Sequence, residues 1–280
     1  MRFGKAVDHM IDKCLKTKIA RIVSGMTVIA FFVMVALLLS RVFICDQFTI
    51  KGDSMLPTFT TGDRIWVNKL LMGARIYKDL DFEESGLDCF RMPGLRKLRP
   101  GDIAVFNDPY ERYGDRIDFV INRVFAKRCI ACPGDTISVI NGYYRNSSGR
   151  DTGIPLHYQQ SVASLSDSRL KDMGAVYPVY PWVEALGWTI KNMGPLYVPG
   201  KGDMVRLDTL NARIYGRLIE YECGAKPIIT DAHVYVNGLR RDTYTFRNNY
   251  YFFAGDNVLN SKDSRYIGLI PEEYIVGIVW

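Results

Sequence analysis

The feature that most constrains this chain is an uncharged apolar run from Ile22 to Ser40. As a helix it would be about 28 Å long at 1.5 Å per residue, close to the roughly 30 Å hydrocarbon core of a bilayer. A cleaved secretion signal would have a shorter apolar region followed by a small-x-small site. The bulky stretch SRVFICDQF follows here instead. The sequence therefore predicts one uncleaved transmembrane helix over residues 22–40.

The net charge of +6 is concentrated before this run. Residues 1–21 carry six basic and two acidic side chains, so the remaining chain contributes only +2. This distribution excludes a basic groove for phosphates, and no nucleic-acid partner is expected. Because basic flanks favour the cytoplasmic side, we expect residues 1–21 to be a cytoplasmic N-terminus. Everything from about residue 46 onward should then lie outside.

Beyond Arg41 the sequence is typical of an antiparallel β protein. Short β-branched and aromatic runs alternate with turn residues, as in DRIWVNKL, GDIAVFNDP, DFVINRVFAKRCIA, DTISVINGYY, HVYVNGLRR and NYYFFAGDN. The Asn-Gly pairs of INGYY and VNGLR predict tight hairpins. The expected fold class is mostly β: an antiparallel sheet or partial barrel with an inserted second subdomain, preceded by one transmembrane α-helix.

The domain organisation is predicted from shifts in composition. Residues 143–232 hold most of the Ser, Gly and Pro turns and two possible short helices, at 162–173 and 181–187. We expect an inserted subdomain at 143–232. It would separate two parts of one β domain, 46–142 and 233–280, which carry the candidate catalytic residues.

The cysteines are Cys14, Cys45, Cys89, Cys129, Cys132 and Cys223. The last four would lie in an oxidising space if the expected topology holds. CIAC has redox spacing, but no helix begins behind it and no second pair completes a zinc site. A structural thiol pair and unpaired buried thiols both remain open, and the pairing is not decided. No metal or other cofactor is expected.

Ser54 stands in KGDSMLPTF, shortly after the apolar run. The stretch is not a GxSxG elbow, and a serine in such a turn is usually structural unless a base accompanies it. The three histidines do not provide one in an informative context. His9 precedes the apolar run, His157 lies in the irregular segment, and His233 begins a strand-like run.

The segment RVFAKRCIACPGD supplies a lysine as the alternative base. Read as a strand, it places Lys127 on one face with Phe125 and Cys129, where the amine can lose water. Burial disfavours the ammonium form; lowering a pKa of about 10.4 by about 3 corresponds to about 4 kcal/mol. A neutral Lys127 could accept the Ser54 proton. A Lys-Arg pair on a solvated strand face is the competing interpretation.

A third segment, GDNVLNSKDSRYIGLIP at residues 255–271, crowds small, acidic and hydroxyl residues into a non-repetitive loop. Such a loop suits packing beneath an active site, and it equally suits any Asx-rich turn.

Together these segments resemble the type I signal peptidases, or leader peptidases, the membrane-bound Ser-Lys proteases that remove signal peptides. The matching motifs are GDSMLPTFTTGD (52–63), RPGDIAVF (99–106), FAKRCIACPGD (125–135) and GDNVLNSKDSRYIGLIPEEYIVG (255–277). They occur in the family's order, behind the family's type of anchor. They leave residues 143–232 uncovered.

The resemblance implies Ser54 as nucleophile, Lys127 as general base, and Ser261 as the hydroxyl that orients the amine at about 3 Å. One position departs from part of the family. Some members carry Ser or Thr two residues before the nucleophile to help hold the oxyanion, whereas Gly52 stands there here. The Ser54 N–H would then need a second donor, such as a main-chain N–H near Gly52 or a water.

The resemblance also implies supporting residues. Met55 and Pro57 would shape the turn of the nucleophile and the adjoining substrate pocket. Arg128 would pair with Asp256, on the strand face opposite the base. The remaining matches would support the loop: Asp263, Ser264 and Arg265.

The implied activity is cleavage of exported preproteins after small-x-small sites, at the bacterial inner membrane, with the lipid bilayer and a secretion translocon nearby. The substrate would add a strand to an exposed edge, either QFTIKG at 47–52 or the strand near Lys127. One alternative is a specialised Ser-Lys peptidase of the same superfamily, for pilin maturation or as a self-cleaving regulator. The other is a non-catalytic membrane-tethered β scaffold, which predicts a solvated Lys127 far from Ser54.

Overall fold

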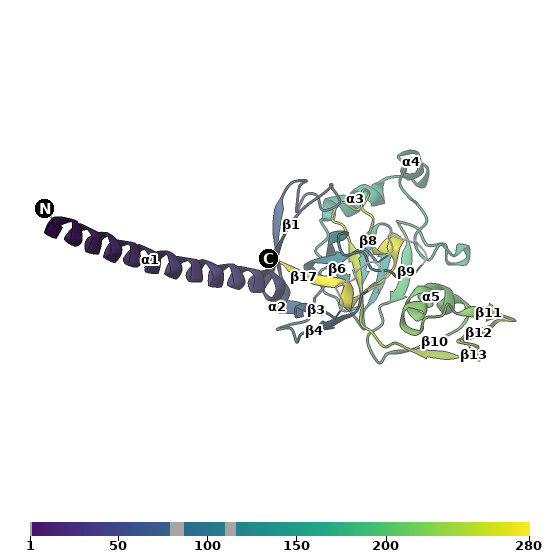
Figure 1. Cartoon of the computed structure of the whole chain (residues 1–280). Helices are drawn as coiled ribbons and strands as arrows, with labels where there is room; N and C mark the ends of the chain where they lie inside the picture. Colours follow the sequence, from purple (N-terminus) through teal and green to yellow (C-terminus); the bar gives the residue numbers. More distant parts are fainter. Residues whose placement is uncertain (1, 79–86, 110–115) are drawn as a thin grey trace.

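The computed structural model describes residues 2–78, 87–109 and 116–280. Helix α1 (Arg2–Phe43) projects away from a β-rich body (Figure 1). Within it, Lys18–Phe43 is long and apolar enough to cross a membrane, and its apolar window is not buried against the rest of the protein. The predicted helix over residues 22–40 is confirmed, and it extends further at both ends.

The central element of the body is a seven-stranded antiparallel sheet in the order β1-β2-β17-β5-β6-β15-β16. Its strands are β1 (Cys45–Thr49), β2 (Arg64–Asn68), β5 (Ile103–Asn107), β6 (Val124–Ala131), β15 (Tyr250–Ala254), β16 (Ile270–Pro271) and β17 (Ile275–Val279). The order interleaves both ends of the chain, so segments some 200 residues apart lie side by side. This interleaving brings the separated sequence motifs to one place.

Smaller antiparallel sheets surround the central one. They comprise β3 (Arg75–Tyr77) with β4 (Cys89–Arg91), β8 (Tyr143–Asn146) with β7 (Thr136–Ile140) and β9 (Met193–Tyr197), β10 (Met204–Arg206) with β14 (Thr243–Thr245), and β11 (Ile228–Thr230) with β12 (His233–Val236) and β13 (Leu239–Arg240). The short helices are α2 (Lys69–Met72), α3 (Leu156–Ser164), α4 (Asp167–Asp172), α6 (Ser264–Ile267), and the 3-10 turns η1 (Glu184–Leu186) and η2 (Glu272–Tyr274). The predicted mostly-β class is confirmed.

Both Asn-Gly hairpins form as predicted. Asn141 and Gly142 have φ values of 50° and 85° between β7 and β8, and Asn237 and Gly238 have 52° and 74° between β12 and β13. Positive φ at both central residues is the type I′ geometry, whose twist matches that of the paired strands.

Residues 143–232 pack onto the central sheet. Their buried side chains share one hydrophobic cluster with Ile130 of β6 and Phe252 of β15. The segment also contains α5 (Thr209–Cys223), which sequence analysis did not predict. Asp208 caps this helix, and its buried face repeats at helical spacing, at Ala212, Tyr215, Leu218 and Ile219. That periodicity was a readable signal.

Candidate active site

Ser54 stands in a tight turn after β1. Gly52 has φ +91°, a conformation that glycine adopts without strain, and open space surrounds its missing side chain. The side chain of Met55 is only 1% exposed, so it anchors the turn in the protein. The Leu56–Pro57 peptide bond in the same turn is cis.

The loop at 255–257 holds this turn from its other side. Asn257 donates its backbone N–H to the Ser54 carbonyl at 3.1 Å and its side-chain Nδ2 to the Asp53 carbonyl at 3.1 Å. Among the described residues, the Ser54 N–H itself has no hydrogen-bond acceptor. It is therefore available to a ligand.

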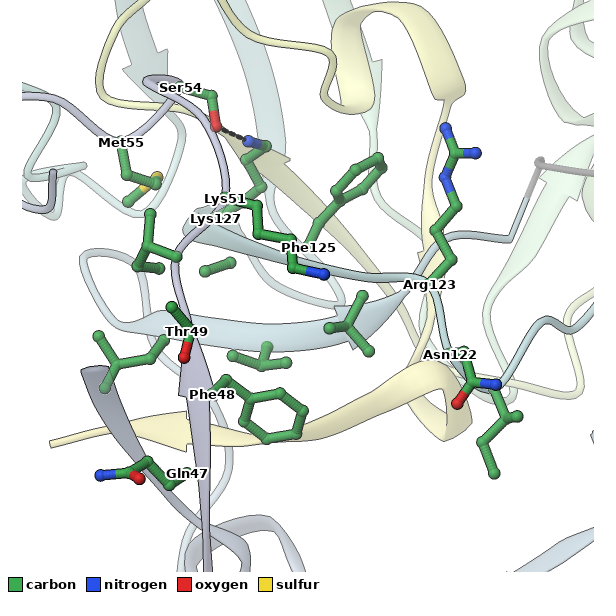
Figure 2. A pocket seen from close by; sticks show the side chains of 16 residues that line it. Gln47, Phe48, Thr49, Lys51, Ser54, Met55, Asn122, Arg123, Phe125 and Lys127 are labelled. Atoms are coloured by element: carbon green, nitrogen blue, oxygen red, sulfur yellow. Dashed lines mark hydrogen bonds between the residues drawn. The ribbon is translucent and has the colours of Figure 1, made fainter. Parts of the chain in front are cut away.

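Lys127 lies on β6 and reaches the Ser54 turn. Its Nζ donates a hydrogen bond to Ser54 Oγ (Figure 2). The strand is fixed by pairing with β5, where Lys127 lies opposite Ala104. The two residues are 73 positions apart in sequence, and the sheet brings them into contact.

The surroundings of Lys127 favour its neutral form. The residue is 3% exposed, and Nζ lies 5.4 Å from the centroid of the Phe125 ring. Burial lowers the pKa of Lys127 from 10.5 to about 8, while the carboxylates of Asp263 and Asp256 oppose this and Arg265 assists it. A substantial fraction of the amine is then neutral near pH 8, as a general base requires.

Arg128 occupies a different environment from its neighbour. Its Nε and Nη2 donate to Asp256 Oδ1 and Oδ2 at 2.7 and 2.6 Å, a bidentate pair. Its Nη1 donates to the Gly101 carbonyl at 2.9 Å, and Asp256 also accepts from the Thr58 hydroxyl. The predicted Arg128–Asp256 pair is confirmed. It joins β6, the Ser54 turn and the 255–265 loop.

A second, fully buried ion pair lies deeper in this loop. Arg265 Nε and Nη2 each donate to the Asp263 carboxylate at 2.8 Å, and both side chains have no solvent exposure. Asp263 also accepts from the Gly255 N–H at 2.9 Å. Its pKa is lowered despite burial, chiefly because Arg265 opposes that effect. Ser264 Oγ accepts from Phe253 N at 3.0 Å, which ties the loop to β15.

Ser261 is brought to the site without the predicted contact. Its Oγ is buried, and within the described residues it makes no hydrogen bond to Lys127. A Cβ added at Gly255 would lie 2.2 Å from this Oγ and 2.5 Å from the Ser54 carbonyl. Gly255 thus separates Ser261 from the Ser54 turn, and a larger residue would displace one of them.

A groove of about 600 Å³ ends at Ser54 and Lys127. Residues 47–51 line one side and residues 121–127 the other (Figure 2). β1 is the terminal strand of its sheet, and β15 pairs with β6 only from Arg128 onward. Both predicted binding edges therefore flank the groove.

Sequence reasoning missed two contributors, Thr58 and Asn257. Both stand inside the motifs already singled out, in MLPTF and GDN. Their roles depend on contacts across about 200 positions of sequence, with Asp256 and with the Asp53–Ser54 backbone. Their position inside these motifs was the sequence signal that could have identified them.

Residues 23–163 and 202–280 match the family model described as signal peptidase, peptidase S26. The chain belongs to this family. Signal peptidase I of Buchnera aphidicola (subspecies Baizongia pistaciae) is 26% identical over 265 residues, covering 90% of this chain and 74% of that protein. Signal peptidase I of Helicobacter pylori strain 26695 is 26% identical, covering 88% of this chain and 77% of its own.

A solved signal peptidase I from Enterococcus faecalis covers 67% of this chain and 100% of its own, at 15% identity and a TM-score of 0.30. The fold assignment therefore stands on the sheet topology above. Membership of the signal peptidase family and the buried contact between Ser54 and Lys127 both oppose the scaffold alternative, which required a solvated lysine far from the serine.

Proposed function

We propose that this protein is a membrane-anchored serine endopeptidase that removes N-terminal signal peptides from exported preproteins. The hydrogen bond between Ser54 Oγ and the buried Lys127 Nζ carries the proposal, because it joins a nucleophile to a base at the end of an open groove. No cofactor is needed for this chemistry.

The reaction begins when neutral Lys127 accepts the Ser54 proton as Oγ attacks the scissile carbonyl. The free N–H of Ser54 stabilises the resulting oxyanion. Lys127, now an ammonium, protonates the departing amine of the mature protein. A water then hydrolyses the acyl-enzyme with Lys127 again as base. Arg128–Asp256 and Asp263–Arg265 would hold the two reacting side chains in place.

The groove supports binding of an extended substrate strand. The open edges at 47–51 and 121–127 can each form backbone hydrogen bonds with it. Apolar side chains, including those of Ile50, Met55 and Val105, line the groove. Because alternate side chains of a strand face the same way, the first and third residues before the bond would meet this lining. The proposal is that small residues at these two positions fit it best.

The anchor supports the proposed location, with residues 1–21 inside and the groove outside the bacterial cytoplasmic membrane, near the translocon. Lys69 Nζ donates to the Arg41 carbonyl at 2.7 Å and to Asp46 at 3.1 Å, which ties the end of α1 to the sheet. In the proposed arrangement, this contact would keep Ser54 close to the membrane surface. Protease added to spheroplasts should digest the residues beyond 46; protection of that region would reject the orientation.

The domain division is part of the same proposal. Residues 46–142 and 233–280 would form the catalytic β domain, because they supply the central sheet and the residues around Ser54 and Lys127. Residues 143–232 would be an inserted subdomain that buttresses this sheet from one side.

The deciding experiment is cleavage of a purified preprotein by the full-length protein in detergent micelles. Ser54→Ala should abolish product formation, whereas Ser148→Ala, at an exposed serine outside the site, should not change it. N-terminal sequencing of the product should show a small residue at the first and third positions before the cut. Cleavage by Ser54→Ala would reject the proposal, and preference for a pilin precursor would identify the specialised relative.

A further inference from the structure

Two cysteines follow Lys127 at the end of β6 and take no part in the proposed chemistry. Cys129 Sγ and Cys132 Sγ are 3.7 Å apart. Cys129 is fully buried, and Cys132 is partly exposed. No side chain separates the sulfurs, which are within hydrogen-bonding contact of each other.

A β-bulge explains why these two side chains meet. In a regular strand, residues three apart point to opposite faces. β6 departs from regularity here, because Phe252 pairs with Ala131 while Phe253 pairs with Cys129, leaving Ile130 as an extra residue. An extra residue reverses the alternation. Cys129 and Cys132 therefore face the same hydrophobic cluster, with Ile130 and Ala131 in the other.

The backbone on both sides of the bulge is fixed. Cys129 exchanges two backbone hydrogen bonds with the turn before β5: its N–H donates to Asp102 O at 2.7 Å, and its carbonyl accepts from Gly101 N at 2.9 Å. The Cys132 N–H donates to Asp135 Oδ2 at 2.8 Å, and its Sγ donates to Leu98 O at 3.3 Å. The sulfurs are held face to face by a framework that does not depend on a bond between them.

We propose that Cys129 and Cys132 are a disulfide-forming site, oxidised by exchange with a disulfide-bearing carrier. Cys132 thiolate attacks one sulfur of the carrier, and the carrier's other sulfur leaves as a thiolate. Cys129 thiolate then attacks the Cys132 sulfur, and the second carrier thiolate leaves. The two protein thiols lose two protons and two electrons, and the carrier disulfide is reduced to two thiols.

The order of attack follows from exposure. Cys132 is the sulfur that a carrier can reach. Burial raises the pKa of the Cys129 thiol and so lowers its thiolate fraction, and Cys129 therefore attacks only in the second step, where its target sulfur is already in contact. Closure requires the sulfurs to approach from 3.7 Å to about 2.05 Å. A metal is a weaker interpretation, since no group of three or more Cys, His, Asp or Glu ligands occurs within the described residues.

The test uses the full-length protein in detergent micelles, equilibrated in glutathione buffers of graded redox potential. After acid quenching and alkylation, trypsin should release residues 129–145, a peptide that contains both cysteines and no other. In oxidising buffer this peptide should be two hydrogen atoms lighter than its reduced form and carry no alkyl group. The transition should follow a two-electron couple, tenfold in equilibrium constant per 29.6 mV.

Two comparisons make the result decisive. Cys132→Ser should leave Cys129 fully alkylated, and Cys89 should remain alkylated in the wild type under the same buffers. The folded protein should hold the disulfide in more reducing buffer than the same protein in denaturant, because only the fold brings the sulfurs together. Two alkyl groups on the peptide in oxidising buffer, a glutathione adduct without closure, or an equal midpoint in denaturant would each overturn the proposal.

This readout does not require the protein to cleave a preprotein, so the disulfide proposal can fail while the proposed peptidase function stands. Disulfide formation inside cells rests on the proposed outward orientation of the catalytic domain. If that orientation is wrong, the cysteines can stay reduced in cells while the purified protein still forms the disulfide.

Discussion

Lys127 and Arg128 are adjacent cations on one strand, and their environments differ in a way that assigns them different work. Lys127 points toward Ser54 in an apolar setting and has no carboxylate within hydrogen-bonding distance among the described residues. Arg128 points away and is held by both oxygens of Asp256. A buried ammonium without a contacting carboxylate loses its proton more easily, whereas a guanidinium does not deprotonate in proteins and can hold a carboxylate through two hydrogen bonds. Strand alternation thus gives neighbouring residues two roles: Lys127 is the proposed base, and Arg128 ties β6 to the loop that carries Asp256.

The largest effect should come from removing the base. Lys127→Ala should lower the cleavage rate of a preprotein by about 10³-fold or more, as loss of a dyad member does, while the melting temperature stays close to wild type. Lys127→Arg should not restore cleavage, because guanidinium does not deprotonate in proteins. Lys97→Ala, at an exposed lysine, is the matched control. Substantial turnover in Lys127→Ala that still requires Ser54 would identify another base.

Removing the Arg128 side chain, and with it the ion pair to Asp256, should first lower the stability of the folded protein. Arg128→Ala leaves Asp256 buried at 0% exposure without its ion-pair partner, and loss of one partner of a buried pair costs about 3–5 kcal/mol. The free energy of unfolding and the cleavage rate should fall together, measured by denaturant titration and initial rates. Arg240→Ala, which breaks an exposed pair with Asp242, should change neither. Normal stability with lost activity would give Arg128 a chemical role instead.

A smaller effect should follow from placing a larger side chain at Gly255, between the Ser54 turn and Ser261. In Gly255→Ala the added methyl group would lie within 2.5 Å of the Ser54 carbonyl and of Ser261 Oγ. Moving the nucleophile by about 1 Å can cost roughly 10²-fold in rate, so kcat should fall by that order with less change in KM. Gly216→Ala is the weaker perturbation, since the nearest atom to its added Cβ is Pro227 Cδ at 4.0 Å. An unchanged kcat would mean that the turn and loop move independently.

The smallest effect concerns the pH dependence of the base. Burial lowers the pKa of Lys127 to about 8, and only the neutral amine can accept a proton. The kcat/KM of the wild type should therefore rise about tenfold per pH unit below that value and level off above it. In Phe125→Ala, water can reach the Lys127 amine. Burial then lowers the pKa of Lys127 less, so the rise in kcat/KM should move to higher pH. If kcat/KM of the wild type instead levelled off only near pH 10.5, burial would not be lowering the pKa of Lys127.

Local sequence patterns determined a large part of this molecule. An uncharged run of membrane-spanning length makes a helix in any context that shields it, and the two Asn-Gly pairs set positive φ at adjacent residues by themselves. The strand runs were readable for the same reason, since a period of two follows from one chain segment. Ser54 and Lys127 were assigned from the resemblance of their short motifs to those of the signal peptidases, and each motif is a local pattern.

Tertiary structure decided what those residues can do. The pKa of Lys127 depends on burial by segments far away in sequence, and the missing Ser261 contact depends on where the 255–265 loop lies against β6. The CIAC spacing did not decide whether Cys129 and Cys132 meet, because residues three apart in a regular strand point to opposite faces. The bulge at Ile130, set by pairing with β15 more than 100 residues later, turns them face to face. Contacts between distant segments depend on the whole fold, so no local window of the sequence contains them.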